Sequence, residues 1–171
     1  MDPTKSRSEN LQLFLYSLLK PVLGKALSTK YFDVEAMKIW LRAFTSESVS
    51  LEDNYEELEF FGDRILGAAF AKYLLKRLPG LSKGQYTELK NLYMSKTHQG
   101  QLARKLGFTP FIVMAGQVSN ISVEEDVFEA FFGAFEIISD NILPGLGFIN
   151  CYNLIVYLFQ GEEIFNQERA K

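Results

Sequence analysis

The chain has 171 residues, a net charge of −3 and a hydrophobic content of 47%, which suits a single core of ordinary domain size. Its one cysteine, Cys151, excludes an internal disulfide and a cysteine-rich zinc site, and is most simply a small core residue. No apolar run approaches the roughly 18 residues that span a bilayer, and the polar start lacks the apolar stretch of a secretion signal. These features predict an intracellular, cytoplasmic protein without a membrane segment.

Apolar residues recur with a period near 3.6 along most of the chain, and strand-like alternation is scarce, so we expect an all-α fold. Turn signals occur at Leu78-Pro79-Gly80 and Leu143-Pro144-Gly145, and Ser82 can cap the helix that follows it. In chain order, the predicted helices cover residues 9–19, 22–27, 34–44, 55–77, 83–95, 97–106, 123–138 and 146–159. No repeat, linker or low-complexity tract interrupts them, which predicts one domain over residues 1–171.

Two short acidic clusters lie within strongly apolar segments. The first contains Glu56, Glu59 and Asp63, and the second contains Asp126 and Glu129. On a helix, spacings of three, four and seven residues place each set on one face. Carboxylates without nearby His or Cys suit Mg²⁺, or Mn²⁺, better than Zn²⁺, so the two clusters together predict a divalent-metal site. The alternative for either cluster alone is a solvated helix face, or first-turn acids favoured by the helix dipole.

Each acidic segment also carries a glycine inside an apolar helical run. Gly62 lies one residue before Asp63, and Gly133 lies four residues after Glu129. A glycine in a helix costs about 1 kcal/mol relative to alanine unless something must approach the backbone closely. We therefore expect two helices to cross tightly at these glycines and bring their acids together.

The basic residues are concentrated in the middle of the chain. Residues 72–105 contain eight lysines and arginines against one acid, Glu88, although the whole chain is acidic. Such a block beside a metal site predicts phosphate contact, whereas each lysine taken alone is more simply part of a solvated face. The candidate phosphate-binding residues in this block are Lys83, Lys90, Lys96, Arg104 and Lys105. His98, the single histidine, is expected to be a surface residue rather than a catalytic base.

The acidic segments resemble a known family. NYEELEFFGDRIL, residues 54–66, is similar to the signature segment of ribonuclease III nuclease domains, and DVFEAFFGAF, residues 126–135, is similar to their second acidic motif. The segment from Gln101 to Phe108 and the helix that begins near Gly147-Phe148 also resemble parts of that domain. The resemblance covers roughly residues 10 to 160.

This resemblance implies a helical nuclease domain that hydrolyses phosphodiester bonds of double-stranded RNA. It implies a symmetric homodimer, with Phe61 at the dimer interface, and a mechanism with two Mg²⁺ ions. The residues matching the family's metal-site acids are Glu59, Asp63, Asp126 and Glu129, and Glu56 matches an auxiliary acid. Two alternatives are a non-catalytic ribonuclease III scaffold in a ribonucleoprotein assembly and an unrelated helical metal protein.

The match to the family pattern is incomplete. Lys83-Gly84-Gln85 stands where bacterial members usually have an acidic-Gly-acidic stretch, and Asn54-Tyr55-Glu56 replaces their usual His-Asn-Glu. Lys90 stands where arginine is common, and a lysine lacks the bidentate fork of arginine toward phosphate. About ten residues follow Phe159, too few for a double-stranded-RNA-binding domain, so a separate partner could supply RNA affinity.

Overall fold

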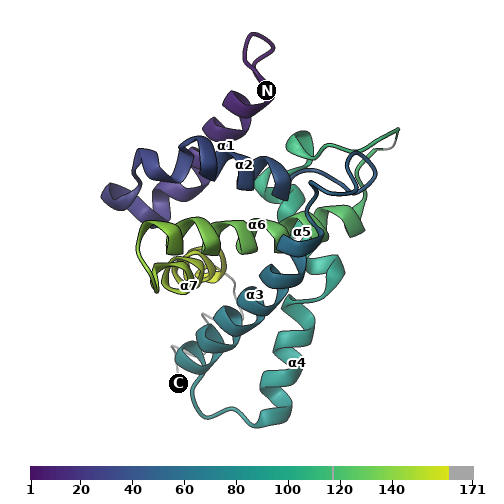
Figure 1. Ribbon diagram of the computed structural model, residues 1–171. Coiled ribbons are helices and arrows are strands. Elements are labelled where there is room, and N and C mark those ends of the chain that lie inside the picture. Colours follow the sequence, from purple (N-terminus) through teal and green to yellow (C-terminus); the bar gives the residue numbers. More distant parts are fainter. Residues whose placement is uncertain (117, 162–171) are drawn as a thin grey trace.

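The computed structural model describes residues 1–116 and 118–161, and within these residues the regular structure is helical (Figure 1). A parallel bridge between Thr45 and Val113 is the β pairing present in the described residues. The predicted all-α fold is therefore confirmed. The α-helices are α1 (Arg7–Leu23), α2 (Val34–Ala43), α3 (Glu56–Arg77), α4 (Lys83–Tyr93), α5 (Lys96–Leu106), α6 (Ile121–Ile142) and α7 (Leu146–Phe159), and the 3-10 turns are η1 (Gly24–Ala26), η2 (Thr29–Phe32) and η3 (Thr109–Phe111).

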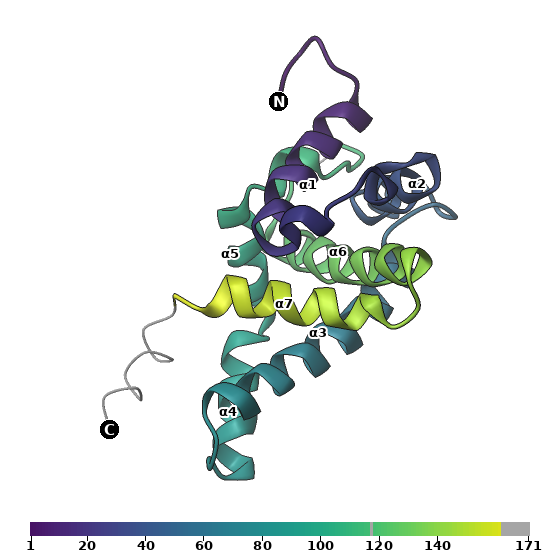
Figure 2. The same ribbon diagram turned by 90° about the vertical axis from the view of Figure 1, so that its left-hand side faces the viewer.

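Helix α6 is the central element of the fold. It packs against α2, α3, α5 and α7, and α7 also packs against α3, as two perpendicular views show (Figures 1 and 2). Most of α6 is buried, including a run from Val127 to Phe135 in which every residue lies in the core. A helix that is apolar on nearly all sides must be surrounded by other elements. The second acidic cluster therefore lies on the most enclosed helix of the molecule.

Aromatic side chains fill the core around α6. Trp40 of α2 stacks on Phe131 at a centroid distance of 5.4 Å, and Phe108 meets Phe131 edge-on at 5.2 Å. All three side chains are at most 1% exposed. Burial of each such side chain stabilises the fold by about 2 to 3 kcal/mol. The many phenylalanines of this chain thus serve packing, as does the fully buried Cys151.

The observed helices differ from the predicted ones mainly at their ends. A separate helix over residues 22–27 was expected, but α1 continues through Pro21 to Leu23 and a 3-10 turn follows. Proline is tolerated here because Pro21 and Ser17, whose carbonyl loses its helical donor, both lie on the exposed side of the helix, open to solvent. Helix α6 begins earlier than predicted because Asn120 caps it, accepting hydrogen bonds from the N–H groups of Ser122 and Val123.

Helices α3 and α4 run side by side and are joined by the Pro79-Gly80 turn (Figure 1). The predicted cap is confirmed: Ser82 Oγ accepts from the N–H of Gln85, and Gln85 Oε1 accepts from the N–H of Ser82. This reciprocal capping box satisfies two helix-end donors. Gln85, which stands where the resemblance implied an acid, therefore has a structural role at the start of α4.

Histidine 98 does not lie in an open, solvated position, which corrects the expectation of a surface residue. Its ring stacks on Phe159 of α7 with centroids 6.1 Å apart and meets Tyr93 edge-on at 5.0 Å. The side chain is half-buried. Aromatic packing between α5 and α7 explains this histidine without a role as a catalytic base.

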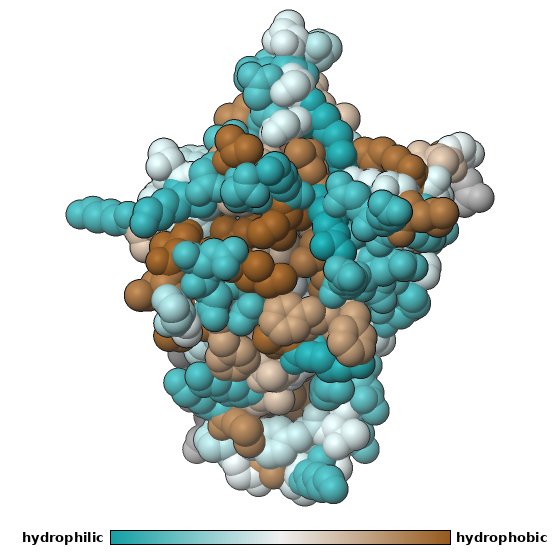
Figure 3. All heavy atoms as spheres, viewed as in Figure 1, coloured by the Kyte–Doolittle hydropathy of each residue, from teal (hydrophilic) through white to brown (hydrophobic). Residues whose placement is uncertain are grey.

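Hydrophobic residues also reach the surface near the middle of the face in Figure 3, among hydrophilic ones. The largest exposed apolar side chains include Leu51, Phe60 and Leu75. None of the helices within residues 1–116 and 118–161 is long and apolar enough to cross a membrane.

Candidate active site

The predicted acids of α3 and α6 meet because the two helices cross with their backbones in contact. A Cβ atom built on Gly62 would lie 1.8 Å from the backbone oxygen of Glu129, far inside any real contact distance. Only glycine, which lacks a Cβ atom, permits this approach. The tight crossing expected from the two glycines is therefore confirmed.

Four carboxylates influence one another at this crossing, and we call them the acid cluster: Glu59 of α3 with Glu125, Asp126 and Glu129 of α6. Burial, and next the charge of Asp126, raise the pKa of Glu59 to about 7. Burial, and next the charge of Glu125, raise the pKa of Glu129 to about 7. Because Glu59 and Glu129 resist ionisation in these surroundings, a cation placed beside them would be stabilising.

Gln99 of α5 holds the most buried acid of the cluster. Its Nε2 donates to Glu129 Oε1 at 3.0 Å and to the backbone oxygen of Met94 at 3.1 Å. Gln99 is 2% exposed and Glu129 is 7% exposed, so this hydrogen bond lies inside the protein. Gln99 is not predictable as a site residue, because nothing in its sequence neighbourhood links it to an acid thirty residues later.

Tyr55 approaches the cluster from the residue before α3. Its hydroxyl donates a long hydrogen bond, 3.4 Å, to Asp126 Oδ2. Burial, and next the charge of Asp126, raise the pKa of this hydroxyl, so it remains a donor at neutral pH. In the sequence, Tyr55 stands out only as a departure from the family pattern. The structure places its hydroxyl against Asp126, a predicted metal ligand.

Lys96, the first residue of α5, supplies a positive charge to the cluster. Its Nζ lies 2.8 Å from Glu125 Oε2 and 3.5 Å from Asp126 Oδ1. The contact with Glu125 is the main reason that the pKa of Lys96 is raised. Lys96 was predicted as an RNA-binding residue, and Glu125 was not singled out. The sequence signal that pointed to Glu125 was its position directly before Asp126, a predicted metal ligand.

Asp63 and Glu56 lie farther from the centre of the cluster. The Asp63 carboxylate pairs with the neighbouring Arg64 guanidinium, and its side chain is about half exposed. Glu56, the first residue of α3, is exposed, and its charge makes a small contribution to the raised pKa of Glu59. Of the five predicted acids, Glu59, Asp126 and Glu129 therefore belong to the acid cluster. Asp63 and Glu56 lie at its margin.

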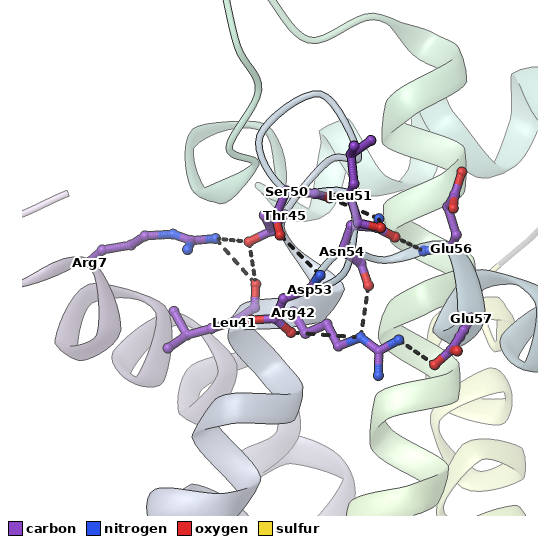
Figure 4. Close-up of polar contacts among 10 residues, drawn as sticks. All are labelled: Arg7, Leu41, Arg42, Thr45, Ser50, Leu51, Asp53, Asn54, Glu56 and Glu57. Atoms are coloured by element: carbon purple, nitrogen blue, oxygen red, sulfur yellow. Dashed lines mark hydrogen bonds and ion pairs between the residues drawn. The ribbon is translucent and has the colours of Figure 1, made fainter.

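Two arginines hold the loop that leads into α3 (Figure 4). Arg7 of α1 donates to the backbone oxygen of Phe44 at 3.1 Å and to Thr45 Oγ1 at 3.0 Å. Arg42 of α2 donates to the backbone oxygen of Asn54 at 2.9 Å and pairs with Glu57. These contacts fix the first turn of α3, which contains Glu59.

Asn54 completes this junction. Its Oδ1 accepts from the N–H of Glu56 at 2.9 Å, and its Nδ2 donates to the backbone oxygens of Ser50 and Leu51 (Figure 4). An asparagine side chain that bonds a backbone N–H two residues ahead favours the start of a helix. Asn54, which replaces the histidine of the family pattern, is therefore a buried structural residue.

Comparison with known proteins decides the family. Residues 56–139, which contain both acidic segments, match the family model of the ribonuclease III domain. The chain belongs to the ribonuclease III family. The matched region extends from the first residue of α3 to Ser139, near the end of α6, so it includes every residue of the acid cluster.

Relatives of this ribonuclease III chain occur in a virus and in bacteria. It is 36% identical over 155 residues to a ribonuclease 3 homologue of Frog virus 3 (isolate Goorha). The alignment covers 84% of this chain and 42% of that protein. The chain is 31% identical over 159 residues to ribonuclease 3 of Flavobacterium psychrophilum, in an alignment that covers 88% of this chain and 58% of that protein. For ribonuclease 3 of Francisella tularensis subsp. novicida the identity is 35% over 129 residues, covering 73% and 53%. The chain thus spans about half the length of these relatives.

Solved structures share the fold. The nuclease domain of ribonuclease III from Campylobacter jejuni superposes with a TM-score of 0.67 at 20% identity, covering 85% of this chain and 96% of that one. A second structure of that domain gives a TM-score of 0.65 at 21% identity, covering 84% and 92%. The predicted ribonuclease III nuclease-domain fold is confirmed.

The basic residues predicted to bind RNA have different surroundings in this ribonuclease III domain. Lys83 and Lys90 lie on α4 and line a cavity of about 430 Å³ whose other walls include Leu74 and Leu75 of α3. Lys105 is exposed near the end of α5. These three lysines keep their charges at the surface, and their contact with RNA stays a prediction.

Arg104 pairs with a buried acid, although its own side chain is 56% exposed. Its Nε lies 3.0 Å from Glu124 Oε2 and its Nη2 lies 2.8 Å from the same oxygen, while Thr109 Oγ1 donates to Glu124 Oε1 at 2.7 Å. Glu124 is fully buried. An arginine that neutralises a buried carboxylate is restrained by it, so the structure gives Arg104 a role in joining α5 to α6.

Phe61, predicted at the dimer interface, lies one residue before Gly62 on α3 and is partly exposed. Its neighbour Phe60 is 67% exposed, with the Arg64 guanidinium 4.8 Å above its ring. A partly exposed aromatic pair is compatible with a surface that another subunit covers. The dimer itself stays a prediction.

Proposed function

We propose that this ribonuclease III domain is a Mg²⁺-dependent endonuclease that hydrolyses phosphodiester bonds of double-stranded RNA as a homodimer. The observation that carries the proposal is the electrostatic interaction of Glu59, Asp126 and Glu129 near the glycine crossing, where burial and neighbouring charges raise the pKa of Glu59 and of Glu129 to about 7. Perturbed carboxylates from two helices, in a family of nucleases, are the mark of a functional site rather than of a solvated face.

The chemistry of the acid cluster fits a divalent cation. All of its ligand atoms are carboxylate oxygens, which suit Mg²⁺ or Mn²⁺. Within residues 1–116 and 118–161, however, no three His, Cys, Asp or Glu side chains converge closely enough to form a complete cage. We therefore infer that Glu59, Asp126 and Glu129 would hold the ion, and that Asp63 would join them by turning away from Arg64.

When bound, Mg²⁺ ions, two of them in the family mechanism, supply an activated water and stabilise charge at the phosphate and the leaving 3′ oxygen. The protein's own contribution is to place the ligands. Gln99 orients Glu129 and Tyr55 orients Asp126 through the hydrogen bonds described above. Residues that orient metal ligands commonly change metal affinity or activity by about 10- to 100-fold when removed.

The substrate class follows from the family and from the position of the lysines. Lys83, Lys90 and Lys105 are exposed on α4 and α5, which lie in the chain between the two helices that carry the acid cluster, α3 and α6. Lysine contacts with phosphates release counterions, so RNA affinity should fall steeply between about 50 and 200 mM salt. Duplex RNA is read mainly by its shape, phosphates and 2′-hydroxyls, so we expect little sequence preference and poor cleavage of duplex DNA.

One observation favours a second candidate, a non-catalytic ribonuclease III scaffold: the acids do not form a complete cage as they stand. Such a scaffold would bind RNA without cutting it. The presence of all four acids that the resemblance implies, Glu59, Asp63, Asp126 and Glu129, favours the nuclease.

The deciding experiment incubates the protein with a long RNA duplex, with or without Mg²⁺, and reads the products on a denaturing gel. Glu129→Gln is the matched control, since it keeps the side-chain volume and removes the charge. We expect cleavage only by the unmodified protein with Mg²⁺, and a loss of more than about a hundredfold in Glu129→Gln because a direct ligand should matter more than an orienting residue. Binding without cleavage would establish the scaffold, and near-normal cleavage by Glu129→Gln would exclude this metal site.

A further inference from the structure

A cation of the protein itself, the ammonium of Lys96, lies beside the acid cluster. The ammonium of Lys96 lies 2.8 Å from Glu125 and 3.5 Å from Asp126, whereas the other cation beside the predicted metal acids, Arg64, pairs with the marginal Asp63. Lys96 begins α5, which Ser95 caps, so its backbone position is fixed by the helix start. The lysine therefore reaches the cluster from a third helix.

Glu125 has no place among the metal-site acids that the family resemblance implies. Yet its side chain is only 13% exposed, and its charge contributes to the raised pKa of both Glu59 and Glu129. A further buried carboxylate beside three others destabilises a protein unless it is paired. The contact with Lys96 is the pairing that this structure provides.

The charge of Lys96 acts beyond its two direct partners. It opposes the rise in the pKa of Glu59, which lies on α3 rather than on α6. The lysine side chain is 52% exposed, while Glu125 and Asp126 are 13% and 19% exposed. A half-exposed lysine can withdraw toward solvent, whereas the carboxylates that hold it cannot.

We propose that Lys96, anchored by Glu125, is the resident counter-cation of the acid cluster, and that a divalent ion must compete with it for Asp126. This inference rests on the proposed function for the existence of the metal site. Before metal binds, Lys96 lowers the repulsion among the four carboxylates. When metal binds, its charge opposes the ion, which sets the Mg²⁺ concentration at which the site fills.

The size of the effect follows from Coulomb's law. A unit charge a few ångströms from a divalent ion at a partly buried site changes the binding equilibrium by about tenfold or more, even at a high effective dielectric constant. Removal of the Lys96 charge should therefore tighten Mg²⁺ binding by at least about tenfold. It should also destabilise the metal-free protein, because the carboxylates would then repel one another without compensation.

The test uses four variants of the whole chain and no RNA. Lys96→Gln removes the charge, Lys96→Arg retains it, and the double variant Lys96→Gln/Glu125→Gln removes both partners and restores the cluster's net charge. Lys38→Gln is the matched control, since Lys38 pairs with Glu35 at 2.7 Å on an open helix face, with both side chains more than half exposed. Mg²⁺ affinity is measured by calorimetry and the melting temperature is measured in EDTA and in Mg²⁺.

We expect Lys96→Gln to bind Mg²⁺ about tenfold more tightly and to melt lower in EDTA, with the loss recovered in Mg²⁺. Lys96→Arg, the double variant and Lys38→Gln should stay near the unmodified protein in both measurements. The inference is overturned if Lys96→Gln binds Mg²⁺ within about twofold of the unmodified protein, or if no variant binds Mg²⁺. If Lys96→Gln did not fold even in Mg²⁺, the double variant would decide the question. A Mg²⁺ affinity of the double variant that differs from that of the unmodified protein would then overturn the inference.

Failure of this inference is distinguishable from failure of the proposed function. A protein that cuts duplex RNA but shows no change in Mg²⁺ affinity in Lys96→Gln would retain its function and lose the counter-cation. A protein that cuts no RNA, yet binds Mg²⁺ more tightly in Lys96→Gln, would retain the counter-cation and lose the proposed activity.

Discussion

Gly62 of α3 and Gly133 of α6 face each other where the two helices cross. A Cβ atom on Gly133 would lie 2.2 Å from the backbone oxygen of Leu58 and 3.2 Å from the N–H nitrogen of Gly62, so the contact is reciprocal. Backbone atoms cannot rotate away as a side chain can. The separation of α3 and α6, and therefore the spacing of their acids, is set by these two missing Cβ atoms.

Replacement of Gly62 by alanine should therefore push the two helices apart. We expect a loss of about 3 kcal/mol or more in the free energy of unfolding, which is the upper end of the range for overpacked cores. Gly67→Ala, on the same helix, is the matched control: its Cβ would meet only Lys90 Cε at 3.9 Å, and the change should stabilise by about 0.5 to 1 kcal/mol. Urea unfolding of both variants measures the difference. Equal stabilities would show that the crossing tolerates a methyl group.

Gln99→Ala should weaken Mg²⁺ binding and RNA cleavage by about 10- to 100-fold, because Glu129 would lose the hydrogen bond that orients it. Gln101→Ala, an exposed position on the same helix, provides the control. Mg²⁺ titration by calorimetry, together with the circular dichroism spectrum, separates loss of orientation from loss of fold. Equal Mg²⁺ affinity in the two variants would remove Gln99 from the site.

Removal of metal should make the stability of the protein depend on pH. Glu59 and Glu129 have a pKa of about 7 in the folded protein and an ordinary value of 4.5, so the folded state binds their protons more tightly. The stability that this tighter binding contributes is complete below about pH 4.5 and is lost as pH rises through about 7. In EDTA, the melting temperature should fall from pH 6 to pH 8.

With Mg²⁺ present this fall should be smaller or reversed, since the ion binds the ionised carboxylates and its affinity rises as they lose their protons. The variant Glu59→Gln/Glu129→Gln should show a flatter pH dependence in EDTA. An identical slope in the unmodified protein and in this double variant would mean that other groups cause the dependence.

Arg104→Gln should destabilise the protein by about 3 kcal/mol, because it leaves the fully buried Glu124 carboxylate without its cation. Lys105→Gln, at the next position of α5, should change stability by less than about 0.5 kcal/mol, as expected of an exposed side chain. Thermal unfolding compares the two. A similar small effect in both would restore Arg104 to the candidate RNA contacts.

Phe61→Ala should weaken the proposed homodimer by about 2 kcal/mol per subunit, the value of burying an aromatic side chain at an interface. Light scattering at micromolar concentration, with duplex RNA and Mg²⁺ present, measures the assembly. Leu51→Ala, at a highly exposed loop residue, serves as the control. An unmodified protein that stays monomeric under these conditions would exclude the dimer and paired cleavage of the two strands.

Local sequence patterns were enough to predict the helical fold and the acids at the centre of the site. Apolar periodicity located the major helices, since each buries one face, and the spacing of the acids placed them on α3 and α6. The glycines predicted the crossing because a glycine within an apolar helix needs a close neighbour to offset its cost. These signals are local, so a single sequence carries them.

The side chains that contact these acids, in contrast, depend on how the helices pack. Gln99 reaches Glu129 across 30 residues and Tyr55 reaches Asp126 across 71, and no local pattern predicts such pairs. Arg104 and Lys96 are equally basic in the sequence, but α5 directs one to the buried Glu124 and the other to the acid cluster. The direction of a long side chain depends on what packs against its helix, and that is fixed only when the helices assemble.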